Sequence, residues 1–375
     1  MGPQTRRTAL IKEIMAIDIS VKNVSDLNDT ELSIWADLQE ADPAVDSAFF
    51  RPEYALAAEA SRGGVEVALL REDSEPVGFL PFERDERDIG RAVTWRLSDT
   101  HGLIVKQGVS WNPIELVRGS NLTALKFDHL IASQEPFQPF HYWVDKAPYM
   151  DVSDGYESYH AERRRAGTSL IRQAERKRRK LDREIGPVRF EYHTLDQDVF
   201  SALLDWKSTQ LECWKLFDVF RVDWVIELLR GLCRVQSPEF SGVMSALYAG
   251  DTLTAVHLGL RSHKILCSWI PTLNPEYQRY SPGVILHLEL AKSAEEYGIT
   301  RIDLGRGSNP LKRSLSSGNI ELAIGSVDRR PLVSALTARS HRAWNALPTS
   351  KLRNFPLAVA ALKFTRDLRN RLTRN

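Results

Sequence analysis

The sequence predicts an α+β protein with two domains, each built on a mostly antiparallel mixed sheet flanked by helices. Three observations lead to this fold class. The chain has 375 residues, which is enough for two domains of ordinary size. Its 43% hydrophobic and 26% charged residues are typical of a globular protein with sizeable cores. Both halves contain helical periodicity followed by short alternating runs that tight turns separate.

The first domain, residues 15–150, begins with a strand, two helices and a hairpin. Residues 17–24 alternate like an edge strand, and residues 29–41 and 49–61 have helical spacing. An acidic turn joins the apolar runs within 65–82, which predicts an antiparallel hairpin. No phosphate-binding loop is apparent in this half, so we expect a domain without a cofactor loop.

A basic segment separates the two halves, within an expected linker at 151–187. Residues 163–183 contain ten basic and two acidic side chains, and we expect a helix that is broken near Gly167. One interpretation is an electropositive face for a nucleic acid, a membrane surface or the phosphates of a cofactor. The alternative is a solvated linker helix that packs through its few apolar residues.

The second domain, residues 188–332, is expected to contain a strand, two helices, three antiparallel strands, a further helix and a last short strand. Ser281 is a good N-cap for that further helix, and Pro282 occupies its first position. The strand at 299–304 carries one acid, Asp303. Because the first N–H groups of a helix point outward, the turn before it predicts an anion site, most often for phosphate.

This stretch also carries a family resemblance. YQRYSPG at 277–283 and IDLGRGSNPLK at 302–312 resemble the C-terminal domain of the CelD-like acyltransferases. These form a branch of the GNAT acetyltransferase superfamily, occur in bacterial cellulose and exopolysaccharide gene sets, and are related to Fem-type aminoacyltransferases. The family positions kept here are Ser281, Pro282, Gly283, Asp303, Arg306, Gly307 and Lys312. Leu311 replaces the usual tyrosine, and Gly283 alone remains of a two-glycine loop.

The resemblance implies two GNAT-like domains, of which the second is active. It also implies acetyl-CoA or another acyl-CoA as co-substrate, without a metal. The reaction would be N- or O-acylation of a saccharide or cell-envelope precursor in cellulose or exopolysaccharide biosynthesis. The cofactor-binding residues would be Trp269, Ile270, Arg279, Ser281, Pro282, Gly283 and Val284. Backbone N–H groups around Ser281 would hold the pyrophosphate, and a gap between strands 265–271 and 299–304 would admit the pantetheine arm.

Four side chains are candidates for catalysis: Asp303, His257, Lys312 and Arg306. Asp303 is the leading proton acceptor, although it could instead form a structural ion pair with Arg306 or Lys312. Lys312 could orient a substrate carbonyl or acid. His257 is a second candidate base, or else a core residue of its strand.

Two alternatives remain open. A Fem-like enzyme would take an aminoacyl group from charged tRNA, which the basic segment would bind. A catalytically degenerate GNAT scaffold would instead hold polysaccharide machinery together.

The location that we expect is cytoplasmic. No run approaches the roughly 18 apolar residues of a membrane span, and three cysteines without metal-ligand spacing suggest reduced thiols. Residues 333–375 carry nine basic and one acidic side chain in an amphipathic pattern. This tail would either contact the inner face of the membrane or fold back on the body. Residues 1–14 are expected to be a flexible leader.

Overall fold

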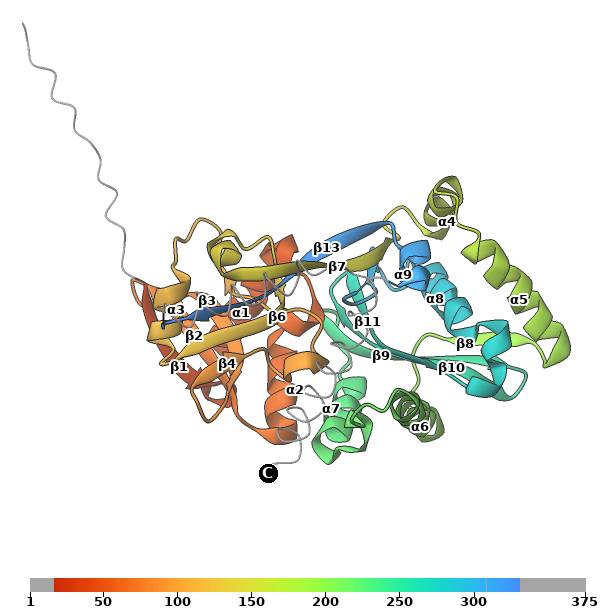
Figure 1. Cartoon of the computed structure of the whole chain (residues 1–375), viewed down its shortest axis with the longest axis horizontal. Coiled ribbons are helices and arrows are strands. Elements are labelled where there is room, and N and C mark those ends of the chain that lie inside the picture. Colours follow the sequence, from red (N-terminus) through yellow and green to blue (C-terminus); the bar gives the residue numbers. More distant parts are fainter. Residues whose placement is uncertain (1–16, 308, 331–375) are drawn as a thin grey trace, which may run out of the picture.

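The computed structural model describes residues 17–307 and 309–330. The predicted leader and basic tail therefore lie outside the described residues. Within them, the strands form a 13-stranded mixed sheet that is mostly antiparallel and is flanked by helices (Figure 1). The strand order is β1-β2-β3-β4-β6-β13-β7-β12-β11-β10-β9-β8, with β5 paired to β3. The predicted α+β class is confirmed, although one sheet runs through both halves.

The first half follows the predicted order. Strand β1 (Asp18–Asn23) lies at the sheet edge, and β2 (Val65–Glu72) and β3 (Glu75–Arg84) form the hairpin. Helix α1 (Asp29–Ala41) begins after Asn28, whose side chain accepts from the Glu31 N–H in a capping box. The other elements are α2 (Pro52–Arg62), β4 (Ile89–Arg91), β5 (Ile104–Val105), α3 (Pro113–Gly119), β6 (Ala124–Ile131) and β7 (His141–Asp151).

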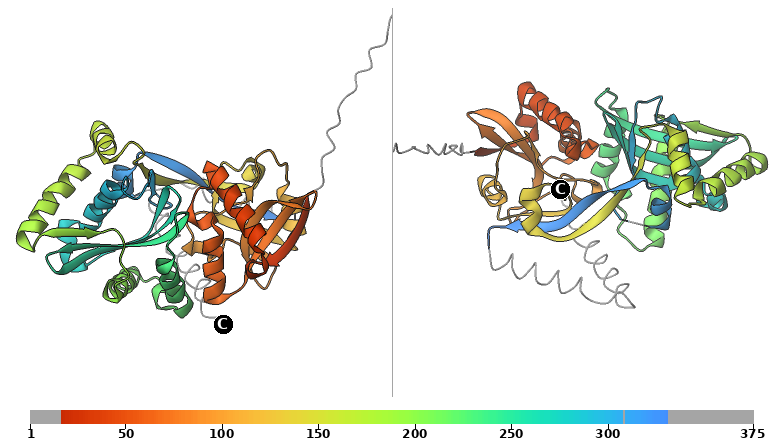
Figure 2. Two further views of the ribbon diagram at one scale, coloured as in Figure 1. Left: turned by 180° about the vertical axis from the view of Figure 1, so that it is seen from behind. Right: turned by 90° about the horizontal axis from the view of Figure 1, so that it is seen from above.

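The basic segment forms two helices, α4 (Tyr156–Arg165) and α5 (Leu170–Glu184), at the outer end of the second half (Figure 2). The break occurs at Gly167, where a φ of +80° favours glycine, so the predicted interruption is confirmed. Helix α5 buries its few apolar residues, among them Ile171 and Leu181. The same hydrophobic cluster includes apolar residues of α8.

The second half contains the predicted helices and strands. They are β8 (Val188–Glu191), α6 (Gln197–Cys213), α7 (Asp223–Arg234), β9 (Phe240–Ala249), β10 (Thr252–Ser262), β11 (Ile265–Leu273), α8 (Pro282–Ser293), β12 (Arg301–Asp303), α9 (Pro310–Leu315) and β13 (Gly318–Asp328). Residues of α6 and α7 pack with one set of β9 and β10 side chains, whereas residues of α5 and α8 pack with the alternate set. The sheet is therefore covered on both faces here.

Two strands join the halves. Strand β13 pairs antiparallel with both β6 and β7, so a strand late in the chain lies between two strands of the first half (Figure 1). Strand β12 pairs with β7 on one side and with β11 on the other. The region around β12 is consequently bordered by residues from both halves.

Candidate active site

Strands β11 and β12 pair at their beginnings and then part. They run parallel and pair at three positions, the last of which joins Cys267 to Asp303. Beyond this point β11 continues along β10. The chain after β12 instead follows β7, because the Leu304 N–H donates to the Pro148 carbonyl at 2.9 Å. A wedge therefore opens between the two strands.

A bulge in β11 lies at this opening. The β10–β11 register moves from Leu258 opposite Ile270 to Leu260 opposite Cys267, so Ser268 and Trp269 together face one residue of β10. Such bulges bend a strand and redirect its side chains, often next to active sites. Ser268 and Trp269 consequently lie at the wall of the wedge.

The wedge contains a polar cavity of about 260 Å³. From the second half it is lined by Ser268, Trp269, Pro271, Leu304, Gly305, Arg306 and Lys312. From the first half it is lined by Ser98, Asp99, Asp128 and His129. Three residues predicted from the sequence, Trp269, Arg306 and Lys312, thus meet at one cavity.

Trp269 both lines the cavity and packs between the halves. Its indole N–H donates to the Leu97 carbonyl, and its ring lies edge-on to Phe49 with centroids 5.6 Å apart. Ile270, the adjacent predicted residue, is 4% exposed and belongs to the hydrophobic core. The side chain of Ile270 is therefore a packing element, and only its backbone lies on the strand that borders the wedge.

Lys312 and Arg306 line the cavity and donate hydrogen bonds to backbone carbonyls beside it. The Lys312 Nζ donates to the carbonyls of Gly305 at 3.1 Å and Arg306 at 3.0 Å, and burial lowers the pKa of Lys312. Arg306 donates to the Asp128 carbonyl and lies 3.8 Å from the Asp128 carboxylate. Both cations thus border the cavity, and neither is paired with Asp303.

Asp303 has a different partner from the two that the sequence suggested. Arg301, two residues earlier on the same side of β12, donates to both carboxylate oxygens at 2.8 and 3.3 Å. Burial raises the pKa of Asp303 and Arg301 lowers it. Asp303 does not line the cavity. The predicted pair with Arg306 or Lys312 is therefore wrong, because a side chain two positions along a strand is nearer than one beyond its end.

His257 lies in the core of β10 and is 0% exposed. Neither ring nitrogen has a hydrogen-bond partner among residues 17–307 and 309–330, and burial lowers the pKa of His257 well below its usual value. It does not line the cavity. This environment matches the alternative of a core histidine.

A second buried histidine, His287 of α8, belongs to the site through Ser268. Its Nδ1–H donates to the Gly283 carbonyl at 2.7 Å, which leaves Nε2 to accept from the Ser268 hydroxyl at 3.0 Å. Burial lowers the pKa of His287, so the neutral ring is favoured. The Ser268 hydroxyl is consequently held in one orientation at the cavity. The pair depends on the packing of α8 on the sheet, which no sequence pattern reveals.

Asp99, like Ser268, is a residue that sequence reasoning missed. Its side chain makes no hydrogen bond or ion pair with the described residues, and one carboxylate oxygen lies 3.0 Å from the position that a Cβ on Gly305 would take. Burial raises the pKa of Asp99 to about 6, while Lys312, His129 and Arg306 oppose the rise. The Asp99 carboxylate therefore lines a polar cavity while its oxygens have no hydrogen-bond partner among the described residues.

The start of α8 differs in detail from the predicted anion site. Ser281 has a φ of +54° and its hydroxyl caps no helix N–H, but instead accepts from Lys177 of α5 at 2.7 Å. The Ser281 and Val284 N–H groups are bonded to backbone carbonyls, whereas the Gly283 N–H makes no backbone bond within the described ranges. Arg279 donates to the Tyr280 hydroxyl at 2.6 Å. Gly283 and the Lys177 ammonium are thus the groups here that an anion would meet.

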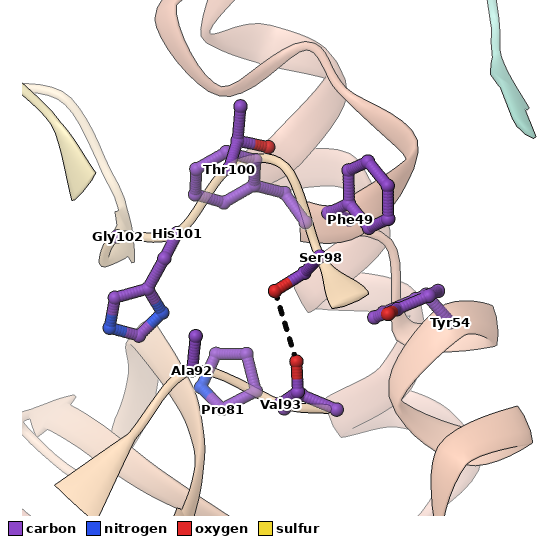
Figure 3. Close-up of a pocket in the computed structure, with 10 residues that line it drawn as sticks. Phe49, Tyr54, Pro81, Ala92, Val93, Ser98, Thr100, His101 and Gly102 are labelled. Atoms are coloured by element: carbon purple, nitrogen blue, oxygen red, sulfur yellow. Dashed lines mark hydrogen bonds between the residues drawn. The ribbon is translucent and has the colours of Figure 1, made fainter. Parts of the chain in front are cut away.

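A smaller cavity lies inside the first half, bordered by Phe49, Tyr54, Val93, Ser98 and His101 (Figure 3). Its volume is about 10 Å³, which suits roughly one water molecule. The Ser98 hydroxyl donates to the Val93 carbonyl at 3.1 Å, and the buried His101 Nε2 has no partner among the described residues. This space is too small for a substrate.

The described residues contain no group of three or more His, Cys, Asp or Glu side chains that could hold a metal ion. They also contain no helix with the length and hydropathy that crossing a membrane requires.

Comparison with known proteins adds a family match and a fold match. Residues 168–313 match the acetyltransferase (GNAT) domain family. FemX is 9% identical over 83% of this chain and 99% of its own, with a TM-score of 0.55. The C-terminal domain of an Agrobacterium fabrum protein described as a lysylphosphatidylglycerol synthetase is 12% identical over 83% and 95%, with a TM-score of 0.52. No curated protein matches the chain.

At these identities the structural likenesses show the fold, and the family match identifies the domain that carries β11, α8 and β12. Residues 168–313 therefore match a GNAT acetyltransferase domain within a larger GNAT-like α+β fold, and the protein is an acyltransferase.

Proposed function

We propose that the protein transfers an acyl group from acetyl-CoA or another acyl-CoA to an amine or hydroxyl group held in the cavity. The observation that carries this proposal is the parting of β11 and β12 at a polar cavity of about 260 Å³. A thioester on an extended arm needs such a gap, and the acceptor needs polar groups beside it.

The chain offers a group for each part of the donor. The edge of β11 beyond Cys267 does not pair with β12, and an extended pantetheine arm would lie along it. The Gly283 N–H at the start of α8, with the Lys177 ammonium at its side, would hold the diphosphate. CoA, when bound, supplies the activated acyl carbon, and the protein positions it against the acceptor.

A saccharide or cell-envelope precursor is the acceptor class that we favour. The YQRYSPG and IDLGRGSNPLK segments, through their resemblance to CelD-like acyltransferases, support a role in cellulose or exopolysaccharide biosynthesis. The cavity wall is consistent with a polar acceptor, since it presents carboxylates, cations and hydroxyls.

Calorimetric titration with acetyl-CoA tests the donor. A Cβ at Gly283 would meet only Leu273 at 3.6 Å, so Gly283→Trp would fill the donor side of the gap without a clash in the core, and we expect loss of binding heat. Gly231→Trp is the matched control, because Gly231 lies on α7 with nothing within 4 Å of its Cβ position. No heat with the unaltered protein, or equal heat with Gly283→Trp, would refute this assignment.

A second candidate is transfer of an aminoacyl group from tRNA. Helix α5 exposes Arg172, Arg176, Arg179 and Arg183 at spacings of three and four residues, which places them on one face. The fold likeness to FemX is consistent with this reading. A steep fall of tRNA affinity with rising salt would support it, and weak, salt-insensitive binding would dismiss it.

A further inference from the structure

We infer that Asp99, from the half of the chain outside the matched domain, is the catalytic base of the transfer. The inference rests on the proposed function, because it assigns the group that removes the proton of the acceptor. It also means that the GNAT domain at 168–313 does not hold the complete site.

Three carboxylates compete for this role, and their contacts separate them. Asp303 is held by two bonds from Arg301 and does not line the cavity. Asp128 lines the cavity but bonds to the His129 ring and lies beside Arg306. Asp99 lines the cavity and makes no hydrogen bond or ion pair with the described residues. Only the Asp99 carboxylate therefore keeps its oxygens available for an acceptor.

The backbone opposite Asp99 is shaped around its side chain. One Asp99 oxygen lies 3.0 Å from the place of an absent Gly305 Cβ, and Gly305 has a φ of +73°. Any larger residue at 305 would be strained and would press on the carboxylate. Asp99 thus reaches the point where the chain leaves β12, in the cavity whose other wall includes Ser268 and Trp269.

The charges around Asp99 suit a base at neutral pH. Lys312, His129 and Arg306 favour its ionised form, whereas burial and Asp303 favour the neutral form. The resulting pKa of about 6 lies close to neutrality, where a general base is most effective. The carboxylate is then mostly ionised at pH 7 and more basic than an ordinary aspartate.

The step balances without another reagent. The acceptor nitrogen or oxygen attacks the thioester carbonyl carbon, forming a C–N or C–O bond while the C–S bond breaks. The proton of the nucleophile passes to Asp99. The CoA thiolate takes a proton from water, and Asp99 returns its proton to solvent after the product leaves.

The test measures CoA thiol release from acetyl-CoA, with glucosamine as a model amine and with water alone as the acceptor, between pH 5 and 9. We expect kcat/KM to rise through about pH 6 in the unaltered protein. Asp99→Asn should lower kcat/KM roughly 10²–10⁴-fold. The rise through about pH 6 should disappear in this variant. Acetyl-CoA binding by calorimetry should change less than about twofold, because the base acts on the acceptor. Asp99→Glu should recover part of the rate.

Asp145→Asn is the matched control, since Asp145 also influences Lys312 but does not line the cavity. Its rate and pH profile should be those of the unaltered protein. If the unaltered protein cleaves acetyl-CoA and folded Asp99→Asn keeps the rate and pH profile, the assignment of Asp99 fails while the proposed function stands. If the unaltered protein neither binds nor cleaves acetyl-CoA, the proposed function fails first.

Discussion

The carboxylates of Asp303 and Asp99 differ in their partners, because each has different side chains within hydrogen-bond distance. Asp303 is paired with the Arg301 guanidinium on its own strand, and that pair braces β12. Asp99 lies near Lys312, Arg306 and His129 but is bonded to none of the described residues. Buried charge is costly unless paired, so the unpaired residue carries a cost in stability that a catalytic role would explain.

Asp99→Asn should therefore stabilise the protein at neutral pH. The folded-state pKa of about 6 lies above the ordinary value of 3.8, so the folded state holds the proton longer than the unfolded state. The free energy of unfolding consequently falls as pH rises between these values. We expect Asp99→Asn to raise it by at most about 3 kcal/mol above pH 7 and by little at about pH 3, where both states are largely protonated. Urea unfolding at both pH values would show this, and an equal effect at both would contradict it.

Arg301→Leu should have the opposite effect on stability. It leaves the Asp303 carboxylate buried without its partner, which costs about 3 kcal/mol in comparable pairs. The loss should shrink as the pH falls toward 4, because burial raises the pKa of Asp303 and the protonated acid needs no cationic partner. In the double variant Arg301→Leu/Asp303→Leu most of the stability should return. A loss in the double variant equal to the sum of the two single losses would show that the pair is not coupled.

Helices and strands were more predictable than the contacts between them. The span of α1 and the break between α4 and α5 follow from local periodicity and glycine conformation, which are local properties of the sequence, although the residue that caps α1 is Asn28 and not the expected Asp29. The Ser281 hydroxyl was expected to cap α8, but it meets Lys177 from a helix about a hundred residues earlier. Asp99 and Ser268 reach one cavity only through the pairing of distant strands. Such long-range contacts produce no periodic pattern in the sequence.

The contact between α5 and α8 predicts a specific loss on substitution of Lys177. Lys177→Met removes the ammonium beside the start of α8, and we expect acetyl-CoA affinity to fall roughly tenfold, as for one charge-assisted bond. Lys177→Arg should retain most of the affinity. Arg172→Met is the control, because Arg172 is exposed on the same helix. Calorimetry would measure the affinity of each variant for acetyl-CoA. Equal losses of affinity for the two Met variants would show that the effect comes from the total positive charge of α5 and not from the position of Lys177.

At the scale of the whole molecule, the sheet makes the two halves one structural unit. Strand β13 is paired on both sides by strands of the first half, and β12 links that half to the second. The cavity borders this junction and takes residues from both sides. We therefore expect the halves to lose structure together.

Leu322→Ala tests this coupling. Leu322 is 0% exposed on β13, and its truncation should cost about 2–5 kcal/mol. Hydrogen exchange should show reduced protection in β2 and β3 as well as in β10 and β11, since one cooperative unit opens. Faster exchange confined to β6, β7 and β13 would indicate that the halves open independently.

The place of β13 also constrains the order in which a nascent chain acquires its shape. Strands β6 and β7 end by residue 151, yet the strand that separates them spans Gly318–Asp328. At synthesis rates of about 5–20 residues per second, their unmatched edges wait roughly ten seconds or more on the ribosome. During that interval the edges of β6 and β7 that β13 later covers have no partner strand. We therefore expect chaperones to bind a stalled chain until residue 328 has left the exit tunnel.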